Sequence, residues 1–171
     1  DIKYTFSTST PKAKVAKSFF EYMHNELSST GMVLSADLFG MTTTNTDDLN
    51  IGQVLENTLP YMDYVAPMVY PSHYPSGFIG IQSPATKPYQ VVKYSMDRAV
   101  ARAEAASSTP SKLRPWLQDF NLGATYTADM VRAQIQATYD AGLSSWLLWN
   151  AANRYTRAAL MPETSTSSPS I

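Results

Sequence analysis

Residues 64–74 read Tyr64-Val65-Ala66-Pro67-Met68-Val69-Tyr70-Pro71-Ser72-His73-Tyr74, and they decide the fold of this 171-residue chain. The first part has no charged side chain and no polar face, which is typical of a parallel strand buried on both sides. The run breaks at Pro71 and continues with hydroxyl groups and an imidazole. Side chains just past the carboxyl ends of barrel strands line active sites. The stretch therefore predicts a core strand that leads into a functional loop, and the alternative is an ordinary Pro-rich loop.

Three further apolar runs have a polar side chain at or beside their ends. They lie at residues 32–37, 113–120 and 145–150, and they carry Asp37, Asp119 and Asn150. With the strand at about 62–70, they make four predicted strands. Each run is short and apolar, as a buried strand of a parallel sheet should be.

Helical patterns separate the four strands, because apolar residues recur there every three or four positions. The expected helices span about 11–27, 48–59, 89–106, 128–141 and 154–161. Thr10, Asp47 or Asp48, and Thr127 are the expected N-caps. Residues expected on buried faces include Val15, Phe19, Met23 and Leu27 in the first helix, Ile51 in the second and Tyr139 in the fourth. A long Pro- and Gly-rich loop fills residues 71–88.

Alternating helices and strands indicate parallel strands with right-handed crossovers. Two architectures accommodate them: a small doubly wound sheet, or part of an eight-stranded α/β barrel. No glycine-rich phosphate fingerprint follows any strand, which disfavours the nucleotide-binding doubly wound sheet. A whole barrel needs about 250 residues. We therefore expect an α/β fold of the TIM-barrel (β/α) type, a half barrel over residues 1–161, with a Ser/Thr/Pro-rich tail or linker at 162–171.

Charge and composition narrow the range of partners. The formal net charge is -1 and the isoelectric point about 6.1, so there is no electrostatic reason to expect nucleic acid or an anionic membrane surface. No apolar run is long enough to span a bilayer, and no signal peptide is visible. The compartment stays open, with an extracytoplasmic or cell-surface location among the options.

The chain has no cysteine, which excludes disulfides and thiolate chemistry. A zinc site would have to use His24, His73 and carboxylates. A metal-dependent hydrolase using His73 with Asp37 and Asp119 is the least favoured alternative, because no HxH or HExxH spacing supports it. We expect neither a metal nor a cofactor.

The polar residues at the strand ends suggest glycoside hydrolysis, which needs one carboxyl to protonate the leaving oxygen and another as nucleophile or base. Asp37 and Asp119 are the candidate catalytic pair. The expected substrate-binding residues are Tyr70, His73, Tyr74, Trp116, Trp149 and Asn150. The alternative for each acid is helix capping or an ion pair with Arg114 or Arg154. For the aromatic residues the alternative is core packing.

Three motifs follow one another along the chain. They are Leu34-Ser35-Ala36-Asp37-Leu38-Phe39-Gly40, then Asp63 followed by the stretch 64–74, then Trp116-Leu117-Gln118-Asp119-Phe120. In this order and spacing, from about Lys12 to Leu160, the chain resembles a bacterial glycoside hydrolase family classed as a domain of unknown function within the TIM-barrel glycosidase group.

The resemblance implies the carboxyl-terminal half of a glycosidase-like barrel, with its last four βα units in this chain. It also implies that Asp37, Tyr70, His73 and Asp119 lie on the sugar-binding face. In that family an acidic strand-four segment precedes the matching region, so one catalytic acid would lie outside these residues. The expected partners are a carbohydrate substrate and either a missing amino-terminal half of the barrel or a second copy of the chain. A non-catalytic carbohydrate-binding or scaffolding module is the alternative function.

Overall fold

The computed structural model describes residues 10–160. The predicted tail at 162–171 and Met161 lie outside the described residues. The strands are β1 Ser35–Phe39, β2 Tyr64–Val69, β3 Trp116–Gln118 and β4 Leu147–Trp149. The helices are α1 Lys12–Leu27, α2 Leu55–Thr58, α3 Pro88–Ala105, α4 Ala128–Asp140 and α5 Arg157–Leu160. Short 3₁₀ turns punctuate the loops, including three between residues 71 and 86.

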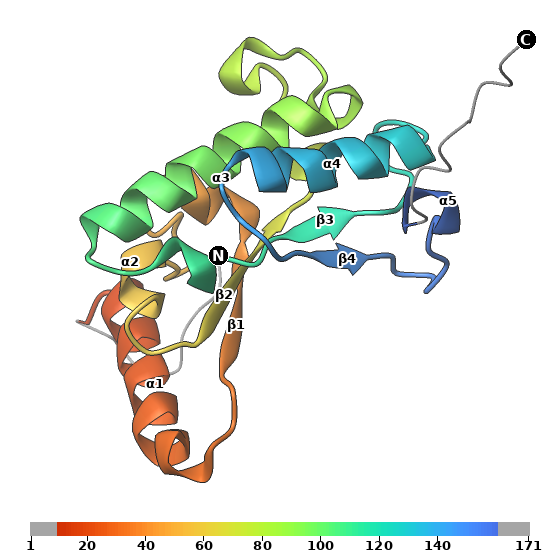
Figure 1. Cartoon of the computed structure of the whole chain (residues 1–171). Coiled ribbons are helices and arrows are strands. Elements are labelled where there is room, and N and C mark those ends of the chain that lie inside the picture. The colour runs from red at the N-terminus through yellow and green to blue at the C-terminus, as the bar shows by residue number, and fades with distance from the viewer. Residues whose placement is uncertain (1–9, 161–171) are drawn as a thin grey trace, which may run out of the picture.

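The four strands form one parallel sheet in the order β1-β2-β3-β4 (Figure 1). This confirms the predicted parallel α/β alternation with strands in chain order. The register pairs Phe39 with Met68, Met68 with Trp116, and Trp116 with Leu147. Strands β1 and β4 are the two edges of this sheet.

Helices cover one face of the sheet, which we call the helix face. There α3 and α4 lie side by side, with α3 against β2 and α4 against β3 (Figure 1). The side chains of Leu38, Val65, Val69 and Leu117 point to this face and are 0% exposed. They form the core with apolar residues of α2 and α3. The core strand predicted at about 62–70 is therefore present as β2, Tyr64–Val69, and its burial organises the fold.

The opposite face of the sheet is covered by no described helix, and we call it the open face. By strand alternation and register it carries Asp37, Phe39, Ala66, Met68, Trp116, Leu147 and Trp149. Phe39 is 36% exposed and Trp149 44%. Parallel sheets are normally covered on both faces. The sheet is thus compatible with part of an α/β barrel.

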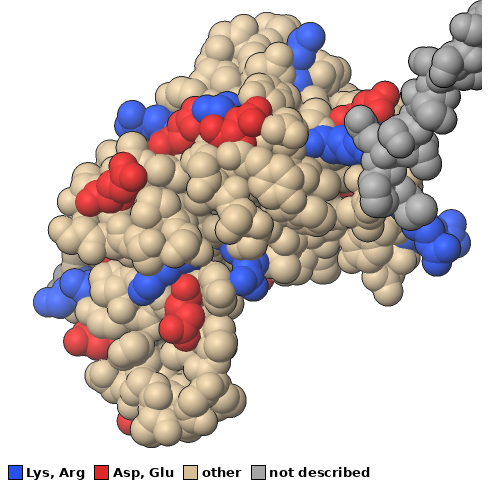
Figure 2. Space-filling view, viewed as in Figure 1, with Lys and Arg blue, Asp and Glu red and all other residues tan. Residues whose placement is uncertain are grey.

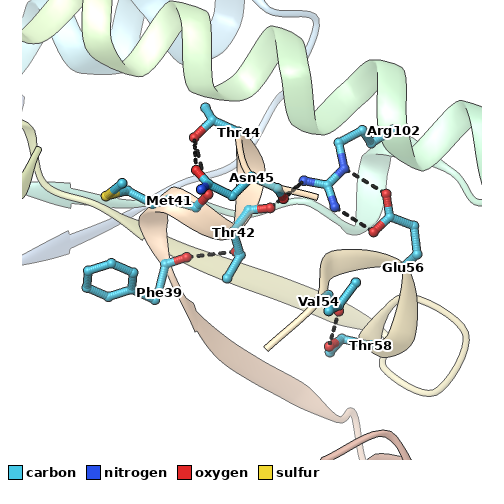
Figure 3. A network of polar contacts seen from close by, with 9 residues as sticks. All are labelled: Phe39, Met41, Thr42, Thr44, Asn45, Val54, Glu56, Thr58 and Arg102. Carbon is cyan, nitrogen blue, oxygen red and sulfur yellow. Dashed lines mark hydrogen bonds and ion pairs between the residues drawn. The ribbon is translucent and has the colours of Figure 1, made fainter. Parts of the chain in front are cut away.

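Arg102 of α3 fixes the loop that follows β1 (Figure 3). Its guanidinium donates to both carboxylate oxygens of Glu56 in α2, and also to the backbone carbonyls of Thr42 and Asn45. Arg102 is 9% exposed, so most of its donors are satisfied inside the protein. Burial acts to raise the pKa of Glu56, but the hydrogen bonds and charge of Arg102 outweigh it and the pKa is lowered.

The predicted second helix at 48–59 is wrong in its first half. Only Leu55–Thr58 is helical, and Leu49 and Asn50 have positive φ values of 50° and 57°. Asp47 accepts from the N–H of Leu49 and Asp48 from that of Asn50. These Asp side chains stabilise turns instead of a helix start, and Ile51 is 51% exposed.

The first helix begins one residue later than predicted and faces solvent more than predicted. Pro11, not Thr10, is its N-cap, and no side chain caps it. Val15 is 50% exposed and Phe19 57%, so the predicted stripe is only partly covered. Phe20 and Met23 pack against the core. Tyr139 of α4 is also on the surface, at 46% exposure, whereas the Thr127 cap is confirmed by its bond from the N–H of Met130.

None of the described helices is long and apolar enough to cross a membrane. On the face seen in Figure 2, acidic and basic side chains are intermixed. That face therefore presents no broad patch of a single sign.

Candidate active site

Asp37 lies inside β1, not at the end of an apolar strand as predicted, because β1 covers Ser35–Phe39 and leaves Met32 and Val33 exposed outside it. Its side chain is exposed on the open face. Oδ1 accepts a hydrogen bond of 2.9 Å from the indole Nε1 of Trp116, two strands away. Oδ2 has no hydrogen-bond partner within residues 10–160. The hydrogen bond to Oδ1 thus orients the carboxylate, and Oδ2 is available to a ligand.

Trp116, which holds this carboxylate, also contacts a second tryptophan. The rings of Trp116 and Trp149 meet edge to face, with centroids 5.9 Å apart and planes at 85°. Trp116 is half-buried, whereas Trp149 is 44% exposed. Exposed, rigid aromatic surface next to a carboxylate can pack on the apolar faces of sugar rings while the acid meets their polar groups.

A second aromatic group follows β2. The Tyr70 ring contacts His73 at 5.2 Å and Phe120 at 5.5 Å between centroids, both edge to face. Burial, then the nearby charges of Asp37 and Tyr155, raises the pKa of Tyr70 far above its usual range, so its hydroxyl stays a hydrogen-bond donor. Burial lowers the pKa of His73 and favours the neutral imidazole. Tyr70 is therefore electrostatically linked to Asp37.

Asp119 has a different environment. It is 3% exposed, and both carboxylate oxygens are already hydrogen-bonded to Thr156. Oδ1 accepts from the Thr156 hydroxyl and Oδ2 from the Thr156 N–H, each at 2.7 Å. Thr156 directly precedes α5, so Asp119 ties the end of β3 to the start of that helix. This corresponds to the capping alternative, not to an ion pair with Arg114 or Arg154.

The structure does not bring the two predicted acids together. Asp37 pairs with Ala66, and Leu117 pairs with Val69, so Asp119 lies five positions further along the strand direction than Asp37. At about 3.3 Å per residue this is roughly 16 Å. Catalytic carboxyl pairs of glycosidases are about 5–5.5 Å apart for retention and about 6.5–9.5 Å for inversion.

Tyr74 and Asn150 also lie apart from Asp37. Tyr74 is 5% exposed in the core, and its hydroxyl is 3.0 Å from that of Ser95, so it does not reach the open face. Asn150 shapes the loop after β4: its Nδ2 donates to the carbonyl of Asp119, and its Oδ1 accepts from the N–H of Ala152 at 2.8 Å. Both residues therefore have evident structural roles.

Asn150 and Asp119 line a pocket of about 460 Å³ beyond the carboxyl ends of β3 and β4. Its wall also includes Phe120, Tyr126 and Arg154. Sequence reasoning did not assign Arg154 to the site. The sequence signal for it is its position in the loop after β4, where barrel sites are built.

A metal site finds no support in this arrangement. No group of three or more His, Asp or Glu side chains in the described part of the chain is placed to hold a metal ion. His73 contacts aromatic rings, and Asp37 contacts Trp116. The metal-dependent alternative therefore lacks a ligand set there.

Comparison of the sequence with known proteins identifies the family of this chain. No curated protein matches the chain. Residues 1–155 match a family whose description is "putative glycosyl hydrolase domain". Because this match covers most of the 171 residues, the chain belongs to that glycosyl hydrolase-like domain family.

Proposed function

We propose that the chain acts on a polysaccharide or oligosaccharide as part of a glycoside hydrolase, and that the sugar binds across the open face. The observation that carries this proposal is the exposed Asp37 carboxylate, held by Trp116 next to the exposed ring of Trp149. The family match supports the same class of activity. Tyr70 and His73 would supply hydrogen bonds to sugar hydroxyls, since both lie beside the carboxyl end of β2.

In this proposal Asp37 is the nucleophile or base, because its Oδ2 is open to a reacting sugar carbon or a water. The proton donor is a second carboxyl group. Asp119 was our other candidate, but its two hydrogen bonds to Thr156 would have to break before it could serve. We therefore propose that the partner acid comes from a segment that packs on the open face.

That segment would be the other half of a (β/α)8 barrel. We propose that residues 1–161 form the carboxyl-terminal half, with a linker at 162–171. The chain-order parallel sheet, which the described helices cover on one face only, supports this architecture. Its two edge strands, and the part of its exposed aromatic face that the sugar does not occupy, are surfaces that barrel closure would bury. A second copy of the chain could bury them as well.

The test of activity is release of reducing ends from a panel of polysaccharides, by the chain together with its complementing half. Asp37→Asn should lower the rate at least a hundredfold, since it removes the charge and keeps the shape. Asp97→Asn is the matched control, because Asp97 is an exposed carboxylate of α3 whose partner is Lys93. Equal rates for Asp37→Asn and the wild-type protein would refute the assignment.

Asp119 supports a second candidate function, a non-catalytic carbohydrate-binding module, because one of the two predicted acids is engaged structurally. Such a module would bind glycans through Trp149 and release no reducing ends. Isothermal titration separates the two functions: binding that is lost in Trp149→Ala, with no hydrolysis by the complemented protein, would favour the module.

Light scattering tests the half-barrel architecture. The isolated chain should associate, because the open face exposes Phe39 and Trp149 and both sheet edges are unpaired in the described residues. A monomer that melts cooperatively and stays monomeric at high concentration would contradict the half barrel.

A further inference from the structure

The pocket beyond β3 and β4 presents one available positive charge. Arg154 is exposed and lines this pocket. Within residues 10–160 its guanidinium has no ion pair, since the salt bridges found there join Lys93 to Asp97 and Arg102 to Glu56. Its backbone N–H donates to Asn150 Oδ1 at 3.4 Å, which fixes the point where the side chain leaves the loop.

The negative charge of the same pocket is already engaged. Asp119 is 3% exposed, and each of its oxygens accepts a 2.7 Å hydrogen bond from Thr156. The buried carboxylate is therefore satisfied by local donors and offers no free oxygen to the pocket. A ligand that enters meets the guanidinium of Arg154 as the accessible charged group.

Tyr126 adds an independent observation. It lines the pocket and is 7% exposed, and its hydroxyl is buried without a hydrogen-bond partner in the described part of the chain. Burial raises the pKa of Tyr126 far above its usual range, so the hydroxyl remains a donor at neutral pH. Buried polar groups are nearly always hydrogen-bonded, so an acceptor that comes within reach of this hydroxyl would satisfy it.

We propose that this pocket binds the carboxylate of a uronic acid residue in the glycan, an inference that rests on the carbohydrate-active function proposed above. The guanidinium fork of Arg154 matches the two oxygens of a carboxylate. Tyr126 and Phe120 line the same pocket, and their side chains offer aromatic surface to the sugar. The pocket volume of about 460 Å³ is in the range of small-ligand sites.

The test is calorimetric titration of the chain with oligosaccharides of glucuronate, galacturonate and mannuronate, each beside its methyl ester. The ester keeps the sugar and removes the charge. For at least one sugar the acid should bind about tenfold or more tightly than its ester, as expected for a charge-assisted hydrogen bond. Arg154→Gln should bring the ratio near one. Arg98→Gln, the same change at an exposed site of α3, should leave the ratio intact.

Three results would overturn the inference: equal binding of acid and ester, an acid preference that survives Arg154→Gln, or binding of no uronate at all. Loss of fold does not complicate the comparison, because the Arg154 side chain is exposed and circular dichroism reports the structure of each variant. Binding or hydrolysis of neutral glycans without any acid preference would refute this inference and leave the proposed function standing. Failure of both the chain and the complemented protein to bind any glycan, acidic or neutral, would refute both.

Discussion

Replacing Asp119 by Asn separates a structural carboxylate from a catalytic one. In the structure, the Thr156 hydroxyl donates to Oδ1 and the Thr156 N–H to Oδ2. Asn keeps one acceptor oxygen but turns an NH₂ group toward the other donor. At least one charge-assisted hydrogen bond is therefore lost at a site that is 3% exposed. Such a bond contributes about 1.5–3 kcal/mol, and the hydrogen bond that remains loses its charge assistance.

We expect Asp119→Asn to lower the free energy of unfolding by about 2–4 kcal/mol, or the melting temperature by roughly 5–10 °C for a domain of this size. Urea titration and thermal melting followed by circular dichroism measure both quantities. Asp37→Asn is the matched control: Asp37 is exposed and accepts one bond from Trp116, so its melting temperature should change by less than about 2 °C.

A double-mutant cycle with Thr156→Val strengthens the test. If the Asp119–Thr156 contact carries the effect, the two changes should couple by about 1 kcal/mol or more. The reasoning is refuted if Asp119→Asn melts like the wild-type protein while hydrolysis by the complemented enzyme disappears. That result would make Asp119 a catalytic residue, as the sequence predicts, and would mean that the contact with Thr156 opens in solution.

The other predictions concern the ion pair of Arg102 with the half-buried Glu56 and the end of β1. Arg102→Met should lower the free energy of unfolding by about 3 kcal/mol in urea titration. The change leaves the carbonyls of Thr42 and Asn45 and the carboxylate of Glu56 without their hydrogen-bond donor. Because the pKa of Glu56 is lowered, its ionised side chain stabilises the folded protein above the usual pKa of 4.5, and this stabilisation is lost as the pH falls below that value. Glu56→Gln should therefore weaken the fall of the melting temperature at acid pH. An unchanged fall would contradict the ion pair. Gly40→Ala should prevent normal folding, since a Cβ there would overlap the carbonyl oxygen of Met68. The control is Gly142→Ala, whose Cβ meets open space at a φ of +82° and which should lower the free energy of unfolding by only about 1 kcal/mol. Similar soluble yields and melting temperatures for the two variants would refute the close contact between Gly40 and Met68.

Patterns that act locally predicted the fold well. The apolar run at residues 64–70 predicts a buried parallel strand because nothing in it can face water, and Val65 and Val69 are indeed fully buried. Thr127 caps α4 through a bond three residues away, so its partner is visible in the sequence. Asp47 and Asp48 were misread because the same short side chain caps helices and turns equally well.

The candidate site was harder to predict because its residues depend on distant partners. Asp119 has the same sequence context whether it is an acid or a capping residue, and its partner Thr156 lies 37 positions away. The bond from Trp116 to Asp37 spans 79 positions and crosses two strands. No periodicity encodes such contacts. The unpartnered hydroxyl of Tyr126 is recognisable only once its surroundings are known.

Periodicity also shows which face of an element is apolar but not what covers that face. Val15 and Phe19 of α1 are exposed, and Phe19 with Phe20 and Met23 borders a groove against Ala36 and Asp37 of β1. The exposed stripe of α1 and the edge of β1 are therefore neighbours. One additional strand paired with β1, followed or preceded by a helix packed on α1, would cover both surfaces at once.

An additional strand paired with β1 would also affect which acid is close to Asp37. A strand beside β1 would place its own carboxyl end next to Asp37, on the open face, at the spacing of adjacent strands of about 4.8 Å. An acid there would lie within the range that a glycosidase pair requires, which Asp119 at roughly 16 Å along the sheet does not. The exposed edge, the uncovered stripe of α1 and the unpaired acid thus have a single explanation in the proposed barrel. A homodimer that covers the open face without pairing a strand to β1 would bury the aromatic rings but leave Asp37 without a partner acid.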